Sequence, residues 1–389
     1  MPKKLRHKTI AVISDTTYPA CSPDDPYNLS RYGSEPMHHL LADTLAKRGH
    51  TVHWYAPRGS SLVTANESVN HPLNLTWGIA PLNENISEQS LDGSRTEDLL
   101  EMEFVIDMSA AAKNIQQIRL YYFYKRYCCY RNGFHSYGPP RVYPEDKHYV
   151  VPSQQNRASF RRGGFDAHVQ YYGISPFYSR DGADPDSFRY FEYFQRKTAE
   201  FMSPRDYFLF PHRITPEKGT GILVQLAKAY PNEKFVIATD TPITGHQEHR
   251  IEVARAIKEL KNIRFVTIPF TPQHHYYKRE LLRNAKAVLS PFNYPEYLEG
   301  FGLVSAEAVA CETPIIISDS PSSRELWIHG TDGLIVEGLS GFKMAIDHFA
   351  SYNFKPRNRY FVEDYAKGYE NIMNYYIEQE ALENSAYIV

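Results

Sequence analysis

Residues 287–311 read AVLSPFNYPEYLEGFGLVSAEAVAC and join a short apolar run to a helical pattern through a turn that contains glycine. The run Ala287–Ser290 predicts a buried strand, and the segment Leu303–Cys311 predicts a helix. Gly300 and Gly302 have no Cβ atoms, so the turn between the predicted strand and the predicted helix is open to the close approach of a ligand. A strand, a tight turn and a helix in this order are typical of α/β folds with parallel sheets.

The same alternation continues on both sides of this stretch. Strands are expected at residues 10–14, 51–56, 104–107, 148–151 and 169–172, and in a second series at 207–210, 235–238, 264–267, 287–290, 315–318 and 334–336. Helices are expected at residues 35–48, 221–230, 251–260, 279–285, 303–311 and 360–379. A run of Gly, Asp, Pro and Ser at residues 179–187 separates the two series. We therefore predict an α/β protein with two doubly wound, Rossmann-like domains.

Composition narrows the possible function classes. The chain has 389 residues, enough for two domains, and its 42% hydrophobic and 23% charged residues indicate a globular protein. A formal net charge of -2 argues against a general nucleic-acid binder. The 4 cysteines form no CxxC pair, so neither a zinc site nor a disulfide framework is expected. No run of about 18 apolar residues is present, and the default location is therefore the cytosol.

The turn before residue 303 has the features of an anion site. Backbone amides of Phe301, Gly302 and Leu303 would point at a ligand, and the start of a helix favours negative charge there. Glu307, one turn into the helix, can accept hydrogen bonds from vicinal hydroxyls such as those of a ribose, and Glu299 can hold sugar hydroxyls. The alternative is an ordinary strand-to-helix turn with two surface glutamates. The two acids around Gly-Phe-Gly-Leu favour the ligand site.

A second motif lies at the start of the second series of strands. Residues 210–219 read FPHRITPEKG, so Arg213 follows a strand and Lys218 precedes a helix. Fixed cations at strand ends can stabilise the charge that develops on a departing nucleoside diphosphate. A solvated turn with surface charges is the other interpretation of this motif.

Together these motifs carry a resemblance to a known family. The pattern Arg213…Lys218-Gly219 followed by Glu299-Gly-Phe-Gly-Leu…Glu307 resembles the family 4 retaining glycosyltransferases of the GT-B fold. Further similar segments are residues 33–35, 41–50, 150–153, 172–174, 318–326 and 332–336. The likeness covers most of the chain and is strongest over residues 299–336.

The resemblance implies roles for specific residues. The implied catalytic residues are Glu299, Arg213 and Lys218, and the implied donor-binding residues are Glu307, Phe301, Gly302, Leu303 and Gly33. The two cations would bind the donor diphosphate, Glu307 the ribose and Glu299 the transferred sugar. The implied reaction is a metal-independent front-face displacement without any cofactor other than the nucleotide-sugar donor. The acceptor would be a hydroxyl of a glycan, a lipid or a small molecule.

The resemblance also implies a domain order. We expect an acceptor-binding domain at residues 1–185, a nucleotide-sugar-binding domain at 186–365 facing it across a cleft, and a C-terminal helix at 366–389 that crosses back to the first domain. Asp184-Pro185-Asp186 mimics a metal-binding Asp-x-Asp, but it lies in the expected linker, and no metal site is expected.

Several positions depart from the family pattern. His212 and the pair Ser322-Ser323 stand where the family has glycines, and the usual acceptor-domain histidine has no clear match. This leaves open a nucleotide-sugar-binding protein with impaired catalysis. The same fold could also serve another reaction, such as epimerisation or phosphorolysis.

Residues 119–131, RLYYFYKRYCCYR, interleave cations with aromatic residues. One interpretation is an acceptor groove or a patch that contacts an anionic membrane, which would place a cytoplasmic protein at the inner membrane surface. The other is a helix leading into a buried strand with a charged rim, and the pattern slightly favours it.

Overall fold

The computed structural model describes residues 8–13, 35–57, 75–80, 103–108, 127–130, 148–164, 166–179, 188–199, 201–239, 247–268, 274–297 and 299–386. These residues form two compact units. The first contains the described residues up to Gly173 together with those from Phe361 onward, and the second contains those from Ile174 to Tyr360. The chain passes between the units after residues 173 and 360, whereas the domain boundaries expected from the sequence follow residues 185 and 365.

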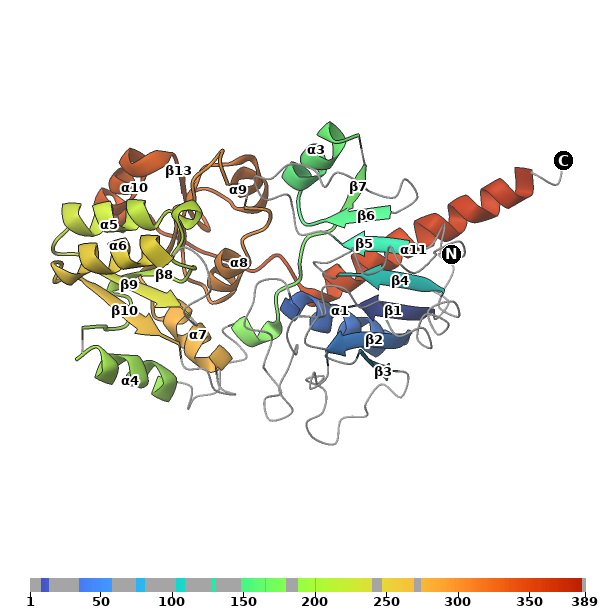
Figure 1. The fold of residues 1–389 in the computed structure, drawn as a ribbon, viewed down its shortest axis with the longest axis horizontal. Coiled ribbons are helices and arrows are strands. Elements are labelled where there is room, and N and C mark those ends of the chain that lie inside the picture. The colour runs from blue at the N-terminus through green and yellow to red at the C-terminus, as the bar shows by residue number, and fades with distance from the viewer. Residues whose placement is uncertain are drawn as a thin grey trace. The chain divides into compact units, whose positions relative to one another are not determined.

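The first unit is built on a parallel seven-stranded sheet in the order β3-β2-β1-β4-β5-β6-β7 (Figure 1). The strands are β1 (Thr9–Ile13), β2 (Thr51–Pro57), β3 (Leu75–Ala80), β4 (Phe104–Asp107), β5 (Tyr127–Tyr130), β6 (His148–Val151) and β7 (Ala167–Val169). The helices are α1 (Glu35–Lys47), α3 (Gln154–Arg162) and α11 (Val362–Ala386). The order runs outward in both directions from β1, which is the doubly wound arrangement.

The C-terminal helix α11 packs on the first unit. Glu370 of α11 is buried and accepts hydrogen bonds from Arg48 Nε at 2.7 Å and Arg48 Nη2 at 2.6 Å, at the end of α1. His50 Nε2 lies 3.1 Å from the same carboxylate. Tyr365 of α11 packs edge-on against Tyr172, with ring centroids 5.9 Å apart. The predicted return of the C-terminal helix to the first domain is confirmed.

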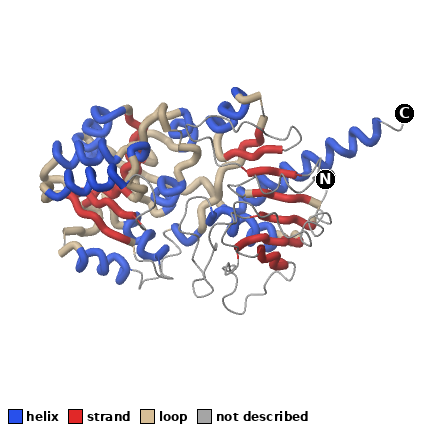
Figure 2. The backbone as a smooth tube through the Cα atoms, in the orientation of Figure 1, coloured by secondary structure: helices blue, strands red, loops and turns tan. Residues whose placement is uncertain are grey.

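The second unit is built on a parallel six-stranded sheet in the order β10-β9-β8-β11-β12-β13. The strands are β8 (Tyr207–Phe210), β9 (Lys234–Thr239), β10 (Ile263–Thr267), β11 (Ala287–Ser290), β12 (Ile315–Ser318) and β13 (Gly333–Val336). The α-helices are α4 (Phe188–Lys197), α5 (Thr220–Ala229), α6 (Gln247–Lys258), α7 (His274–Arg283), α8 (Leu303–Ala310), α9 (Pro321–Leu326) and α10 (Gly338–Asp347). Short 3-10 turns are η3 (Pro176–Tyr178), η5 (Pro216–Lys218) and η6 (Phe349–Ser351). Figure 2 shows the strands of this unit in red with helices in blue around them.

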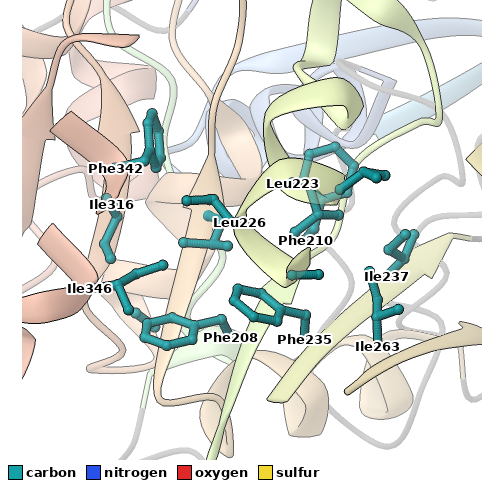
Figure 3. Close-up of a cluster of buried hydrophobic side chains, with 14 of the residues drawn as sticks. Phe208, Phe210, Leu223, Leu226, Phe235, Ile237, Ile263, Ile316, Phe342 and Ile346 are labelled. Atoms are coloured by element: carbon teal, nitrogen blue, oxygen red, sulfur yellow. The ribbon is translucent and has the colours of Figure 1, made fainter. Parts of the chain in front are cut away.

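Helices cover both faces of this second sheet. Phe208 and Phe210 of β8 pack into a buried cluster with Leu223 of α5 and Phe342 of α10 (Figure 3). The alternate residue Tyr207 faces the other way, because its hydroxyl donates to the Leu281 carbonyl of α7 at 2.7 Å. Since side chains alternate along a strand, one row of β8 packs on each helical layer. The predicted Rossmann-like architecture is confirmed.

Some elements differ from those predicted. Strand β7 ends at Val169 instead of extending over 169–172, because Tyr172 packs against α11 and not within the sheet. Helix α3 was not predicted, since its sequence QQNRASFRR has few apolar residues; Ser153 caps it by accepting from the Asn156 amide at 3.2 Å. Strand β3 and helices α4, α9 and α10 were also not predicted. Of the aromatic and basic segment 119–131, only β5 lies within the described residues. It forms a strand, which is what the interpretation as a helix leading into a strand predicted for this part.

No helix in the described ranges is both long enough and apolar enough to cross a membrane.

Candidate functional site

The predicted site residues of the second unit follow two adjacent strands. The strand order changes direction between β8 and β11, which are neighbours in the sheet. Loops after two such strands lead away to opposite sides, and ligands of open α/β sheets bind there, at the carboxyl ends of the strands. Arg213 and Lys218 lie on the loop after β8, and residues 299–307 lie on the loop and helix after β11.

The two loops are joined by backbone contacts. Asn293, after β11, donates from its amide to the Glu217 carbonyl at 3.0 Å and from Nδ2 to the Pro216 carbonyl at 3.0 Å. Gly219 has φ +76°, and a Cβ built on it would lie 1.6 Å from the Pro291 carbonyl oxygen. Only glycine allows this conformation and this approach. The loops therefore hold each other in position.

Lys218 and Glu299 form an ion pair across the loops. Lys218 Nζ lies 2.5 Å from Glu299 Oε2 and donates to the Tyr297 hydroxyl at 2.9 Å. Burial lowers the pKa of Lys218, but Glu299 and Tyr297 together outweigh it and leave that pKa above its ordinary value. The Ser322 hydroxyl donates to the Glu299 carbonyl at 2.6 Å and fixes the backbone there. Lys218 is thus a charged ammonium that Glu299 and Tyr297 hold in a fixed position.

Arg213 is the second cation of the site. Its side chain is exposed, and within the described ranges its guanidinium makes no hydrogen bond or ion pair. Its charge acts on Tyr297: burial raises the pKa of that phenol, and Arg213 and Lys218 counter part of the rise. Arg213 is therefore near the ion pair and available to an anion.

Helix α8 begins at the same place with uncapped amides. Its N-cap is Gly302, at φ +73°, and no side chain caps the helix. The first amides of a helix have no intrahelical acceptor and carry partial positive charge. The Phe301 ring turns away into a cluster, with Tyr360 at 5.0 Å and Trp327 at 6.4 Å. The Phe301 side chain is therefore part of the core, and the backbone is what the turn can offer a ligand.

Glu307, on α8, pairs with a residue of another helix. Lys278 of α7 donates from Nζ to Glu307 Oε1 at 2.9 Å and lies 2.7 Å from Oε2. The α8 helix thus carries its acid next to a cation that the sequence analysis did not single out.

A buried polar chain lies near the loop after β8. His212 Nε2 is 2.9 Å from the Ser290 hydroxyl, which is 3.1 Å from the Ser305 hydroxyl at the start of α8. Burial, and then the charge of Lys218, lower the pKa of His212 to about 3, so its ring is neutral at physiological pH. The histidine that replaces a family glycine therefore connects β8, β11 and α8.

The structure brings most of the predicted site residues together. Arg213, Lys218, Glu299 and the turn at 301–303 meet at one edge of the sheet, and Glu307 follows on the same helix. Gly33 lies outside the described residues. Sequence reasoning missed the partners Tyr297, Lys278, Ser290 and Ser322. Tyr297 stands next to the motif and could have been suspected, whereas Lys278 has no motif around it.

Comparison with known proteins finds sequence similarity that is confined to part of the chain. Residues 193–358 match the family model described as glycosyl transferases group 1. The chain is 32% identical over 131 residues to an alpha-maltose-1-phosphate synthase of Mycolicibacterium smegmatis, which is 33% of this chain and 32% of that protein. It is 30% identical over 152 residues to a D-inositol 3-phosphate glycosyltransferase of Mycobacterium bovis, which is 39% of this chain and 30% of that protein. The match thus spans about a third of the length of these curated relatives.

Solved structures are similar over nearly the whole chain. Anabaena Alr3699/HepE in complex with UDP and glucose matches with a TM-score of 0.62 and 15% identity, over 98% of this chain and 100% of that one. A glycosyltransferase from Rickettsia africae matches with a TM-score of 0.68 and 17% identity, over 96% and 99%. AviGT4, a glycosyltransferase of avilamycin A biosynthesis, matches with a TM-score of 0.57 and 18% identity, over 96% of each chain. The GT-B fold expected from the resemblance is confirmed.

Proposed function

We propose that this protein is a retaining glycosyltransferase that transfers a sugar from a nucleoside-diphosphate sugar to a hydroxyl acceptor. The family match of the second unit and the glycosyltransferase relatives support transfer of a sugar. The similar Anabaena structure, a complex with UDP and glucose, supports a nucleotide sugar as the donor.

One observation carries the proposal. At the reversal point of the second sheet, the ammonium of Lys218 and the exposed guanidinium of Arg213 lie beside the uncapped start of α8. Two cations and a set of helix amides form a site for a doubly charged diphosphate. Glu299 at the same place can accept hydrogen bonds from sugar hydroxyls, and Glu307 from a ribose.

The chemistry follows from these groups. The bond between the anomeric carbon and the diphosphate oxygen breaks, and the acceptor oxygen bonds to the same face of that carbon. The acceptor proton passes to the departing phosphate, so that no protein side chain has to act as the general base. Because the acceptor attacks directly on the face that the phosphate leaves, no protein carboxylate has to act as a covalent nucleophile. Lys218, Arg213 and the α8 amides stabilise the negative charge that grows on the leaving diphosphate. We propose that these fixed charges do the work that a metal ion would otherwise do.

A thermal-shift screen with UDP-, GDP- and ADP-sugars tests donor binding first, since a ligand of the native state raises its apparent stability. The matching donor is then incubated with acceptors, and NMR reads the anomeric configuration of the product with and without EDTA. We expect a product with the configuration of the donor and a rate unchanged by EDTA. Inverted product would refute the retaining mechanism, and donor binding without transfer or hydrolysis would favour the catalytically impaired alternative.

A further inference from the structure

Lys278, the partner of Glu307, lies outside every motif of the sequence. Both side chains are largely buried, with 21% of the lysine side chain and 11% of the glutamate side chain exposed. Taking two charges out of water is costly, and such a pair is stable only when its geometry is good. The pair also lies in the site, because Glu307 is on the helix whose first turn is the uncapped anion site.

The contact leaves hydrogen-bonding capacity on the glutamate. Lys278 Nζ donates to Oε1 at 2.9 Å, while its 2.7 Å approach to Oε2 makes no hydrogen bond. Oε2 is buried and has no hydrogen-bond partner among the described residues. A carboxylate offers about four lone-pair positions, so one ammonium leaves room for two hydroxyl donors. A ligand hydroxyl can donate to one of the remaining positions beside the ammonium.

Helix α7 holds Lys278 in place. Its neighbour Arg279 is buried at 1% exposure and lies over the Phe177 ring, 4.3 Å from the centroid. Arg279 Nη1 also donates to the Phe177 carbonyl at 3.3 Å, and Nε pairs with Glu280 at 3.3 Å. The backbone that carries Lys278 is therefore fixed against η3, and the ammonium reaches α8 from a defined point.

We propose that Lys278 is a positioning residue for the donor's ribose: it holds the Glu307 carboxylate in place so that this carboxylate accepts hydrogen bonds from both ribose hydroxyls. The proposal rests on the proposed function and names the part of the donor that the Lys278–Glu307 pair recognises. Without Lys278 the largely buried carboxylate loses its counter-charge. It then turns toward water, and in that orientation it accepts hydrogen bonds from the two hydroxyls less well.

Direct binding of UDP, GDP and ADP, each compared with its 2′-deoxy and 3′-deoxy form, tests this. A hydrogen bond to a charged group contributes enough that the unmodified protein should bind its ribonucleotide about tenfold or more tightly than either deoxy form. In Lys278→Met the ratio of ribonucleotide affinity to deoxynucleotide affinity should fall to about two or less, and the same is expected for Glu307→Gln. Lys278→Arg, which keeps the charge, should retain most of the ratio. Lys278→Gln serves as a second neutral variant if the methionine variant does not fold.

Lys286→Met is the matched control. It breaks a lysine–glutamate pair of the same unit, with Nζ 2.8 Å from Glu233, at the amino end of β11, away from the site. It should leave the ratio unchanged. A folded Lys278→Met or Lys278→Gln protein with the unmodified ratio overturns the proposal. An unmodified protein that binds ribo- and deoxynucleotides equally also overturns it and leaves the proposed function standing, whereas one that binds no nucleoside diphosphate overturns the proposed function itself.

Discussion

Replacing Gly219 by alanine tests how the two loops of the site support each other. Gly219 has φ +76°, where an L-residue costs about 1–2 kcal/mol. The added Cβ would also lie 1.6 Å from the Pro291 carbonyl oxygen and 2.5 Å from the Pro291 carbonyl carbon. Neither atom is the end of a flexible side chain, so the loop after β8 must move away from the loop after β11. We expect the free energy of unfolding of the second unit to fall by about 3 kcal/mol or more.

The chain offers a matched control two residues away. Gly221 lies in α5, and a Cβ on it meets nothing within 4 Å. Gly221→Ala should stabilise the second unit by about 0.5–1 kcal/mol, because glycine is unfavourable inside a helix. Urea unfolding is followed by fluorescence in a Trp54→Phe/Trp77→Phe background, where Trp327, the only tryptophan among residues 174–360, reports on this unit alone. Donor binding should fall in Gly219→Ala alone, since its loop carries Lys218. Equal stability of the two variants would refute the reasoning on loop packing.

Three further predictions follow from single side chains. Lys218→Met should weaken nucleoside-diphosphate binding by about tenfold or more, because a charge-assisted hydrogen bond to the diphosphate is lost, whereas Lys286→Met should not weaken it. Calorimetry would measure the affinity of both variants, and equal affinities would contradict the role of Lys218. Burial and the charge of Lys218 lower the pKa of His212 to about 3, so the native state resists protonation of this ring. The second unit should therefore lose stability as the pH falls from about 6.5 toward 3. His212→Gln should flatten that part of the urea-midpoint curve, and an unchanged slope would count against a buried neutral ring. Burial raises the pKa of Glu370, but hydrogen bonds from Arg48 and His50 outweigh burial and lower this pKa below 4.5. The stabilisation of the first unit by the Glu370 carboxylate should therefore be present above pH 4.5 and be lost as the pH falls further. Glu370→Gln should cost about 1–3 kcal/mol at neutral pH and remove this loss, as measured by the fluorescence of Trp54 and Trp77 in a Trp327→Phe background. A variant as stable as the unmodified protein would show that the contact does not hold α11.

The sequence predicted buried strands better than polar helices, and for a physical reason. Strands buried on both faces are continuous apolar runs, and Tyr207–Phe210, Ala287–Ser290 and Ile315–Ser318 were placed to the residue. Helix α3 lacks such a run, because it is held by the Ser153 cap and by few apolar contacts. Its periodicity was therefore too weak to read.

The site residues also divide into those that the sequence could predict and those that only the fold brings into contact. Residues 299–307 and Arg213–Lys218 could be predicted because each lies within a few residues of a strand end, where the chain order itself brings groups to one edge. Lys278 could not be predicted, because α7 reaches α8 only through tertiary packing. His212 was recognised as a departure from the family, but its contact with Ser290 depends on the pairing of β8 with β11.

Hydrogen exchange in the presence of a bound nucleoside diphosphate tests the location of the site most directly. Amides that take an acceptor from the ligand exchange more slowly, and mass spectrometry assigns the effect to peptides. We expect slowed exchange in peptides covering residues 210–220 and 299–308, with little change at the opposite, amino-terminal edge of the same sheet. Saturating ligand that leaves both of these peptides unchanged and slows exchange elsewhere would contradict it.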